Sequence, residues 1–375
     1  MSSWIPYGRQ TVEEDDIQAV IEVLRSDWLT TGPMVERFEN ALAERVGARF
    51  AVSFNSGTAA LHAAYFAAGV GPGDEVVTSP LTFAATANAA LYLGARPVFV
   101  DVQEDTGNLD PEQVRRVLTA RTKVIAPVDF AGHPADLDEL KEIAREAGAV
   151  LVEDACHALG AMYRGRSVGS IADMTVFSFH PVKHITTGEG GAVVTDNPTY
   201  YQRLRLFRNH GITRDATYLT REPEGPWYYE MQVLGYNYRL SDIAAALGFS
   251  QLRKLDRFLQ RRREIATRYG ELLKGLPLQT PVPRSDVVPA WHLYVVRLSE
   301  PERRRAVVEG LHRLGIGVQV HYVPVYRHPY YRNISSRAYC PVAERVYAAS
   351  LSLPIYPLLS DAEVERTVMA LRSVL

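Results

Sequence analysis

Cysteine is scarce in this chain of 375 residues, which contains only Cys156 and Cys340. Two cysteines are too few for a disulfide framework or for a cysteine-rich metal site. Excess charge of one sign is also absent, because 41 Lys and Arg residues stand against 43 Asp and Glu residues, giving a formal net charge of −2. This balance provides no long-range attraction to nucleic acid or to anionic lipid. We therefore expect no metal site, no nucleic-acid partner and no membrane partner.

Long apolar runs are absent as well. No stretch of about 20 apolar residues is present that could cross a membrane as a helix. Residues 1–8 have neither the basic start nor the apolar core of a secretory signal peptide. No Gly-x-Gly-x-x-Gly motif follows the first predicted strand, which counts against a Rossmann-type dehydrogenase. These absences favour a globular protein of the reducing cytoplasm.

From about residue 50 the chain alternates short apolar runs with helical patterns. Buried β-rich runs that alternate with amphipathic helices predict an α/β fold with a largely parallel sheet covered on both faces. Such sheets bind ligands at the carboxyl ends of their strands. The predicted strands are residues 50–54, 75–78, 97–100, 124–128, 150–152, 175–178 and 192–195.

The C-terminal part has a different pattern, which begins with a proline-rich stretch at residues 276–283 that predicts a linker. Because 375 residues are too many for one ordinary core, we predict two domains. Residues 1–250 would form an N-terminal arm and a large domain, and residues 251–375 a small α+β domain. The predicted elements of this part are one helix from 242 toward 258, strands at 291–298 and 317–321, and helices at 300–314 and 361–375.

A single lysine, Lys183, lies in a polar loop between the apolar strands of residues 176–195. A lysine held between buried strands is costly unless it has a partner or a chemical task. Glycines follow it at positions 188, 190 and 191, where small residues let the backbone approach a bound group closely. We hypothesise that Lys183 forms a Schiff base with an aldehyde cofactor.

Asp154 ends a strand that is otherwise apolar apart from the adjacent Glu153. A buried carboxylate needs a strong partner, and the protonated nitrogen of a pyridine ring would supply one. The alternative is that Asp154 caps the following helix. Asp154 precedes Lys183 by 29 residues, a spacing that places both at the same edge of the sheet. His157 either contacts the ring or is a structural histidine.

Two further segments follow predicted strands. Residues 55–60 open a helix whose free N–H groups favour a phosphate, helped by the hydroxyl groups of Ser56, Thr58 and Ser178. An ordinary Ser/Thr helix cap is the alternative. Phe83 either covers the face of a flat cofactor ring or is a core aromatic. Asn237 and Arg239 either bind an anion or lie in a solvated turn.

With these residues placed, the chain resembles the DegT/DnrJ/EryC1/StrS family of nucleotide-sugar aminotransferases, which are pyridoxal-phosphate (PLP) enzymes of fold type I. The resemblance runs nearly end to end. It implies a large domain with a mostly parallel seven-stranded sheet and a smaller C-terminal α+β domain. The motifs that carry it are residues 28–33, 55–61, 80–86, 152–160, 177–195, 235–252 and 317–326.

The resemblance also implies roles for individual residues. Lys183 matches the Schiff-base lysine, Asp154 the partner of the pyridinium nitrogen, and Phe83 the aromatic that stacks on the ring. His157 takes the place of a Gln or His near the ring. Phosphate contacts match Gly57, Thr58 and Ser178, together with Asn237 from the neighbouring subunit, which implies a homodimer with shared active sites. Candidates for contacting the sugar nucleotide are Tyr7, Thr31, His184, Arg239, His321 and Tyr322.

Residues 177–191, 129–132 and 157–160 resemble the subgroup that acts in pseudaminic-acid synthesis. Those enzymes use L-glutamate to aminate C4 of a UDP-linked 4-keto-6-deoxy-N-acetylhexosamine. His184 stands where that subgroup is expected to have proline. One alternative is a PLP-dependent sugar dehydratase, but those enzymes typically have His at the position of Lys183. The other is a non-catalytic, ligand-sensing relative, which the retained Lys183, Asp154 and Ser178 disfavour.

Overall fold

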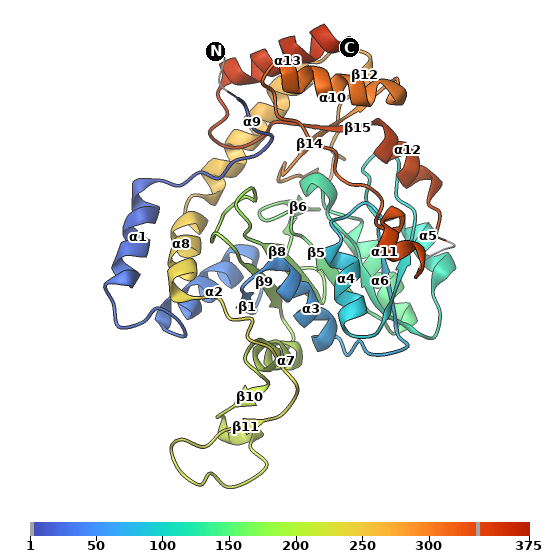
Figure 1. Cartoon of the computed structure of the whole chain (residues 1–375). Helices are drawn as coiled ribbons and strands as arrows, with labels where there is room; N and C mark the ends of the chain where they lie inside the picture. Colours follow the sequence, from blue (N-terminus) through green and yellow to red (C-terminus); the bar gives the residue numbers. More distant parts are fainter. Residues whose placement is uncertain (1–3, 335–337) are drawn as a thin grey trace.

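A seven-stranded, mostly parallel sheet forms the centre of the molecule (Figure 1). The computed structural model describes residues 4–334 and 338–375. The strand order is β1-β9-β8-β5-β4-β2-β3, and β9 alone runs antiparallel to its neighbours. The predicted α/β fold is therefore confirmed. The strands are β1 (Phe50–Phe54), β2 (Glu75–Thr78), β3 (Arg96–Phe99), β4 (Thr122–Ala126), β5 (Val150–Asp154), β8 (Met174–Ser178) and β9 (Gly191–Thr195).

Helices cover both faces of this sheet. Successive strand residues point to opposite faces, so Val152 joins one core and Leu151 another. Both cores are apolar, which is why the strands read as continuous hydrophobic runs. One face is covered by α3 (Gly57–Ala67), α4 (Ala85–Tyr92) and α7 (Pro198–Arg208). The other is covered by α2 (Pro33–Val46), α5 (Pro111–Val117), α6 (Leu137–Ala147) and α8 (Asp242–Leu252).

Asp242 connects two helices that are far apart in sequence. Its buried carboxylate accepts hydrogen bonds from the backbone N–H groups of Gly32 and Met34, at 2.7 Å and 2.9 Å, and so caps the start of α2. Ser241 caps α8, because its hydroxyl oxygen accepts from the N–H of Ala244. The loop of residues 28–33 is thereby fixed against the start of α8.

The C-terminal part contains a three-stranded antiparallel sheet in the order β12-β14-β15. Its core includes Ile5 of the N-terminal arm. The prediction of a strand at residues 317–321 is wrong, because Gln319 alone forms a bridge in this segment, to Ser352. The strand β15, which was not predicted, pairs with β14, directly follows a helix and contains two buried serines. The elements are β12 (Leu278–Gln279), β14 (Tyr294–Leu298), β15 (Ser350–Leu353), α10 (Arg304–Arg313), α12 (Pro341–Ala349) and α13 (Asp361–Val374).

The single helix predicted to lead away from the sheet is two helices, α8 and α9 (Leu255–Leu272). The first part of α9 packs on the large core through Leu255 and Leu259, and its later part packs on the C-terminal core through Ile265 and Tyr269. One helix thus belongs to both bodies. The domain boundary between residues 250 and 251 stays a prediction.

Arg262 lies at the middle of α9 and is buried. Its Nη1 donates hydrogen bonds to the carbonyl oxygens of Trp291, His292 and Ile355. No carboxylate pairs with it in the part of the chain that the structure describes. Burial lowers the pKa of this guanidinium to about 10. Arg262 therefore joins the helix to two segments of the C-terminal part.

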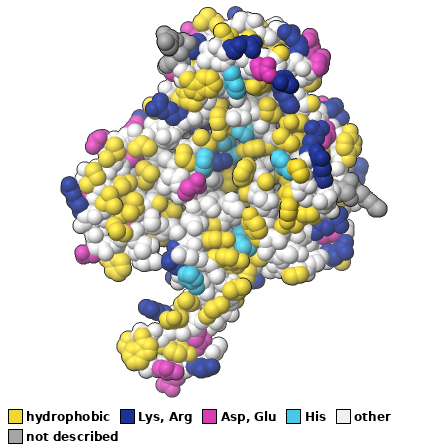
Figure 2. Space-filling view, in the orientation of Figure 1, with side chains coloured by type: hydrophobic (Ala, Val, Ile, Leu, Met, Phe, Trp, Pro, Cys, Tyr) yellow, Lys and Arg dark blue, Asp and Glu magenta, His cyan; other side chains and the backbone are white. Residues whose placement is uncertain are grey.

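A two-stranded arm of β10 (Ile212–Thr213) and β11 (Glu230–Met231) projects from the body below α7 (Figure 1). Residues 214–229 connect these strands. The arm exposes large apolar side chains, among them Trp227, Met231 and Leu234. Figure 2 shows hydrophobic side chains over much of its surface. Apolar area of this kind on a projecting element marks an interaction surface.

The remaining elements are short or peripheral. Among the described residues, none of the helices has the length and apolar character needed to span a membrane. These elements are α1 (Glu14–Leu24), β6 (Met162–Tyr163), β7 (Arg166–Ser167), β13 (Val287–Val288), α11 (Pro329–Arg332) and four 3-10 turns, η1 (Phe130–Gly132), η2 (Ala216–Tyr218), η3 (Pro301–Arg303) and η4 (Val325–Arg327).

Candidate active site

A cavity of about 630 Å³ opens at the carboxyl ends of β5 and β8. The two strands run parallel with Asp154 opposite Val176, so the residues that follow them meet at one edge of the sheet. In Figure 2 several histidine side chains lie around the centre of the face shown, between the body and the C-terminal part. The sequence-predicted residues that line the cavity are Tyr7, Gly57, Thr58, Phe83, Asp154, His157, Ser178, Lys183, His321 and Tyr322.

Lys183 lies in the loop between β8 and β9, where its N–H donates to the carbonyl of His180 at 2.9 Å. Its side chain is partly buried and its Nζ has no hydrogen-bond or ion-pair partner among the described residues. Burial lowers the pKa of Lys183, and the nearby Arg262 lowers it further. Cys156 and Asp154 oppose this shift. A neutral amine is therefore more accessible here than on an ordinary lysine.

Asp154 is the last residue of β5 and is buried. Its Oδ2 accepts a hydrogen bond from the hydroxyl of Thr86 at 2.7 Å, and its Oδ1 accepts from the N–H of Cys156 at 3.2 Å. It forms no ion pair with any described residue. No helix follows β5 directly, so the alternative of a helix cap does not hold. Thr86 was not recognised from the sequence, although it lies in the motif of residues 80–86.

The start of α3 forms one wall of the cavity. Ser56 caps this helix, its hydroxyl oxygen accepting from the N–H of Ala59 at 3.1 Å. The N–H groups of Gly57 and Thr58 lie in the first turn and have no acceptor within the helix. A Cβ atom on Gly57 would lie 3.1 Å from Cβ of Ser178. The two alternatives for residues 55–60 are therefore compatible: Ser56 caps the helix, and the free N–H groups of the same turn are available to an anion.

Gly191 controls how closely this turn approaches the strands. A Cβ atom there would lie 2.7 Å from the backbone nitrogen and Cα of Gly57. Real Cβ atoms do not approach backbone atoms this closely, so only glycine fits. Of the glycines that follow Lys183, Gly191 therefore has this structural role: it lets β9 lie against the start of α3.

A group of buried histidines lies beside Lys183. Nε2 of His157 is 3.1 Å from the Tyr322 hydroxyl, and its ring centroid is 4.3 Å from that of His292. His184 lies behind this wall rather than on it, with Nε2 3.1 Å from the carbonyl oxygen of Ala290. Burial lowers the pKa of all three imidazoles well below the ordinary value, so they are neutral. His292, which directly precedes β14, was missed because a lone histidine in a predicted apolar strand carries no signal in the sequence.

The opposite wall comes from the N-terminal arm and the C-terminal part. The rings of Tyr7 and His321 have centroids 5.5 Å apart, and Nδ1 of His321 is 2.8 Å from the Ser352 hydroxyl. Burial lowers the pKa of His321 to about 4. Phe83 is 65% exposed, which rules out the alternative of a core aromatic. Its ring is free to cover a flat ligand.

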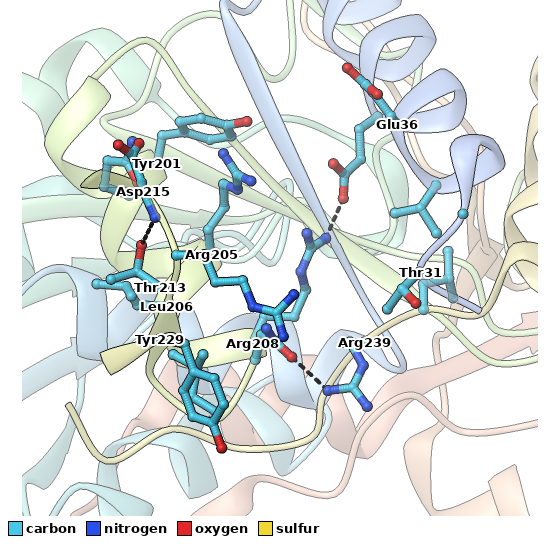
Figure 3. A pocket seen from close by; sticks show the side chains of 18 residues that line it. Thr31, Glu36, Tyr201, Arg205, Leu206, Arg208, Thr213, Asp215, Tyr229 and Arg239 are labelled. Carbon is cyan, nitrogen blue, oxygen red and sulfur yellow. Dashed lines mark hydrogen bonds and ion pairs between the residues drawn. The ribbon is translucent and has the colours of Figure 1, made fainter. Parts of the chain in front are cut away.

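Thr31 and Arg239 do not line this cavity. They line a second cleft, of about 820 Å³, at the base of the arm (Figure 3). Arg205 and Arg208 also line it; Arg208 is paired with Glu39, and Arg239 donates to Oδ1 of Asn209 at 2.7 Å. Asn237 is exposed, and its backbone bridges to Asn209. None of these three predicted residues therefore lines the cavity that contains Lys183 of the same chain.

The cavity fits a flat aldehyde cofactor that carries a phosphate. Among the described residues, the lysine amine has no hydrogen-bond or ion-pair partner, the carboxylate of Asp154 has no cation, and Nδ1 of His157 is buried without a partner. The helix start beside Ser178 provides free N–H groups for an anion. These features together define a PLP-dependent enzyme, in which the cofactor supplies the electron sink.

Comparison with known proteins identifies the class more closely. The chain belongs to the DegT/DnrJ/EryC1/StrS aminotransferase family, whose model matches residues 10–372. It is therefore a PLP-dependent sugar aminotransferase, and the predictions of fold, cofactor and enzyme class are confirmed.

Several relatives resemble the chain over nearly its whole length. It is 41% identical to the spore coat polysaccharide biosynthesis protein SpsC of Bacillus subtilis, over 99% of this chain and 97% of that protein. The structure of Helicobacter pylori PseC, an aminotransferase involved in the biosynthesis of pseudoaminic acid, has a TM-score of 0.93 and 34% identity, covering 99% of both chains. The PLP-form of a putative sugar aminotransferase from Streptococcus pneumoniae has a TM-score of 0.91 and 33% identity, covering 99% of this chain and 100% of that one.

The contact between Gly191 and Gly57 predicts the effect of Gly191→Ala. The added methyl group would force β9 and the start of α3 apart, so we expect a loss of about 1–3 kcal/mol of unfolding free energy and weaker retention of PLP. Denaturant unfolding and cofactor absorbance after gel filtration measure the two effects. Gly71→Ala is the control, because no atom lies within 4 Å of its Cβ position. A Gly191→Ala protein that matches this control in both measurements would contradict the steric argument.

Proposed function

We propose that this enzyme transfers the amino group of L-glutamate to C4 of a UDP-linked 4-keto-6-deoxy-N-acetylhexosamine, in the cytoplasm, during pseudaminic acid-type biosynthesis of an amino sugar. The observation that carries the proposal is the juxtaposition of Lys183 and Asp154 at the edge of the sheet, in a cavity that both halves of the chain close. The likeness to PseC over the whole chain supports the choice of sugar.

Lys183 is the proposed anchor and proton carrier. PLP, when bound, supplies an aldehyde carbon that bonds to amines and a ring that withdraws electrons. Lys183 would hold the cofactor through its Nζ, and the same amine would take the proton from the α-carbon of glutamate. An ordinary lysine has a pKa of about 10.4, too high for a base near neutrality. Burial lowers the pKa of Lys183, which moves its amine toward the range in which it can accept this proton.

The other proposed cofactor contacts keep the ring in place. Asp154 stays an acceptor for a ring N–H because Thr86 and Cys156 donate to its two oxygens. Phe83 would cover the ring, and His157 would contact it from the histidine wall of the cavity. The N–H groups of Gly57 and Thr58 and the hydroxyl groups of Thr58 and Ser178 would hold the phosphate.

The sugar is proposed to lie against Tyr7, His321 and Tyr322, on the wall formed by the N-terminal arm and the C-terminal part. The neutral imidazole of His321, held by Ser352, and the two phenol groups offer hydrogen bonds without charge. Such groups suit hydroxyl and keto oxygens. His184 acts on the opposite, histidine wall from behind, through Ala290 and the adjacent His292.

We also propose a homodimer in which each active site is shared. Asn237, Thr31 and Arg239 are the predicted contacts that their own cavity lacks, and they lie near the base of an arm with exposed apolar side chains. A second copy that covered the arm would bury this apolar area. By twofold symmetry, each chain would then offer Asn237 to its partner's phosphate site.

Lys183 is expected to be the covalent attachment point. Borohydride converts a bond between a lysine and an aldehyde to a stable amine, so reduced wild-type holoenzyme should gain the mass of one cofactor per chain. Lys183→Ala should gain none, and exposed Lys274→Ala should behave as wild type. Intact-protein mass spectrometry gives the result. A cofactor mass on reduced Lys183→Ala would disprove the assignment.

The reaction is tested with a panel of UDP-linked keto sugars and L-glutamate labelled with nitrogen-15. The proposal predicts 2-oxoglutarate and a labelled 4-amino sugar nucleotide, with no product when the keto group is absent. Mass spectrometry and NMR locate the label. Loss of water from the sugar without transfer of label would instead indicate a dehydratase, and label at another carbon would refute the C4 assignment.

Shared sites are tested by mixing two inactive variants, Lys183→Ala and Asn237→Ala. In a hybrid dimer one site would combine an intact Lys183 with the partner's intact Asn237. Because about half of randomly mixed dimers are hybrids with one good site of two, activity should recover to about a quarter of wild type. Each variant mixed with itself is the control. No recovery, although native mass spectrometry shows hybrids, would mean that Asn237 serves its own chain or none.

A further inference from the structure

Three carboxyl groups lie together where β4 and β5 end. Asp129 and Glu153 are fully buried, and Asp154 is almost fully buried. None of them forms an ion pair with a described residue. Asp154 has two donors, Thr86 and Cys156, and belongs to the cavity already described. Asp129 and Glu153 point away from that cavity and have no part in the proposed reaction.

Each of these two side chains has one oxygen with a donor and one without. Oδ1 of Asp129 accepts from the N–H of Ala135 at 2.9 Å, and Oε2 of Glu153 accepts from the Thr175 hydroxyl at 2.7 Å. Oδ2 of Asp129 and Oε1 of Glu153 are buried and find no donor among the described residues. The two side chains nevertheless lie within hydrogen-bonding contact of each other. Two ionised carboxylates are acceptors only and cannot bond, so one must carry a proton.

We infer that Asp129 and Glu153 share a single proton, which Asp129 carries on Oδ2 and donates to Oε1 of Glu153, and that this bond positions the segment behind Asp154 and His157. The location of the proton follows from the other donors. Glu153 receives the Thr175 hydroxyl and the backbone N–H of Gly169, both of which favour its charged form. Burial raises the pKa of Asp129 well above its usual range, and it raises the pKa of Glu153 to about 7.

The bond ties the loop of residues 129–135 to β5. The N–H of Asp129 donates to the carbonyl of Asp154 at 3.1 Å, and the N–H of Asp154 donates to the carbonyl of Pro127 at 2.8 Å. Further along the loop, Gly132 packs so tightly that a Cβ atom would lie 2.7 Å from the carbonyl oxygen of His157. Asp129 and Glu153 are thus positioning residues. Their functional meaning rests on the proposed role of Asp154, but the sharing of the proton does not.

The shared proton has a consequence for stability. The ionisable groups that act on the pair are Asp154 and Cys156, and Thr175 is its hydroxyl donor. In the unfolded chain both carboxyl groups lose their protons near pH 4. The folded pair keeps at least one, so its contribution to stability is full below about pH 4 and falls as pH rises toward and past 7. For each proton that the folded chain keeps and the unfolded chain has lost, the unfolding equilibrium constant increases about tenfold as the pH rises by one unit in this range.

Asp129→Asn and Glu153→Gln test the inference in the holoenzyme. Each amide keeps the oxygen that accepts from Ala135 or Thr175 and supplies an N–H to the opposite carboxylate, so no proton need be retained. Between pH 5 and pH 8, the unfolding equilibrium constant should rise with pH less steeply in either variant than in wild type. The difference should be at least a factor of ten per pH unit. Glu75→Gln is the control, since Arg121 and Thr119 donate to that buried carboxylate, and its slope should match wild type. If the unfolding of both test variants depended on pH as steeply as that of wild type, the proposal would be overturned.

A second measurement needs only the wild-type holoenzyme and therefore does not depend on the variants folding. Infrared spectra at pH 8 should contain the C=O stretch of one buried protonated carboxyl group, which shifts when aspartate is labelled with carbon-13. No such band would overturn the sharing, and a shift only with labelled glutamate would overturn the placement on Asp129. Neither readout depends on amino transfer, so failure of the proposed function leaves this test intact.

Discussion

The active-site region depends on the close approach of Gly57 and Gly191. With no Cβ atom at either position, the first turn of α3 lies directly against the start of β9. The loop that contains Lys183 connects β8 to β9 and must therefore close over this turn. One steric condition thus places a helix N-terminus and a buried amine at the same sheet edge. A methyl group here would disturb the anion-binding turn and the lysine loop together.

Burial controls the charge of the deep wall. The imidazoles of His157, His184 and His292 are kept neutral, so they offer hydrogen-bonding groups in and behind this wall without adding positive charge beside Lys183. Arg262, a buried cation bound by carbonyl groups, fixes the segment that carries His292 and also lowers the pKa of Lys183. The same residue therefore serves the packing of α9 and the electrostatics of the amine.

The sequence was most informative where residues follow strands of the parallel sheet. The carboxyl ends of such strands converge, so Asp154, Ser178 and Lys183 could be grouped from the order of apolar runs alone. Contacts between residues far apart in the sequence could not be predicted, because no local sequence pattern indicates them. Thr86 on Asp154 and His292 against His157 depend on the way in which distant segments pack. The strand β15 was missed because its alternating serines are buried by tertiary packing.

The N-terminal arm imposes an order on the completion of the fold. Ile5 receives a hydrogen bond from Gly317 and donates one to Gly315, and the carbonyl of Tyr7 accepts from Ile355. During synthesis, residues 5–7 therefore wait for almost the whole chain before they find their places, whereas the strands of the large sheet are complete by residue 195. The sheet can assemble while the ribosome is still working. The wall that Tyr7 contributes to the cavity closes last, so the cavity takes its final shape only at the end of folding.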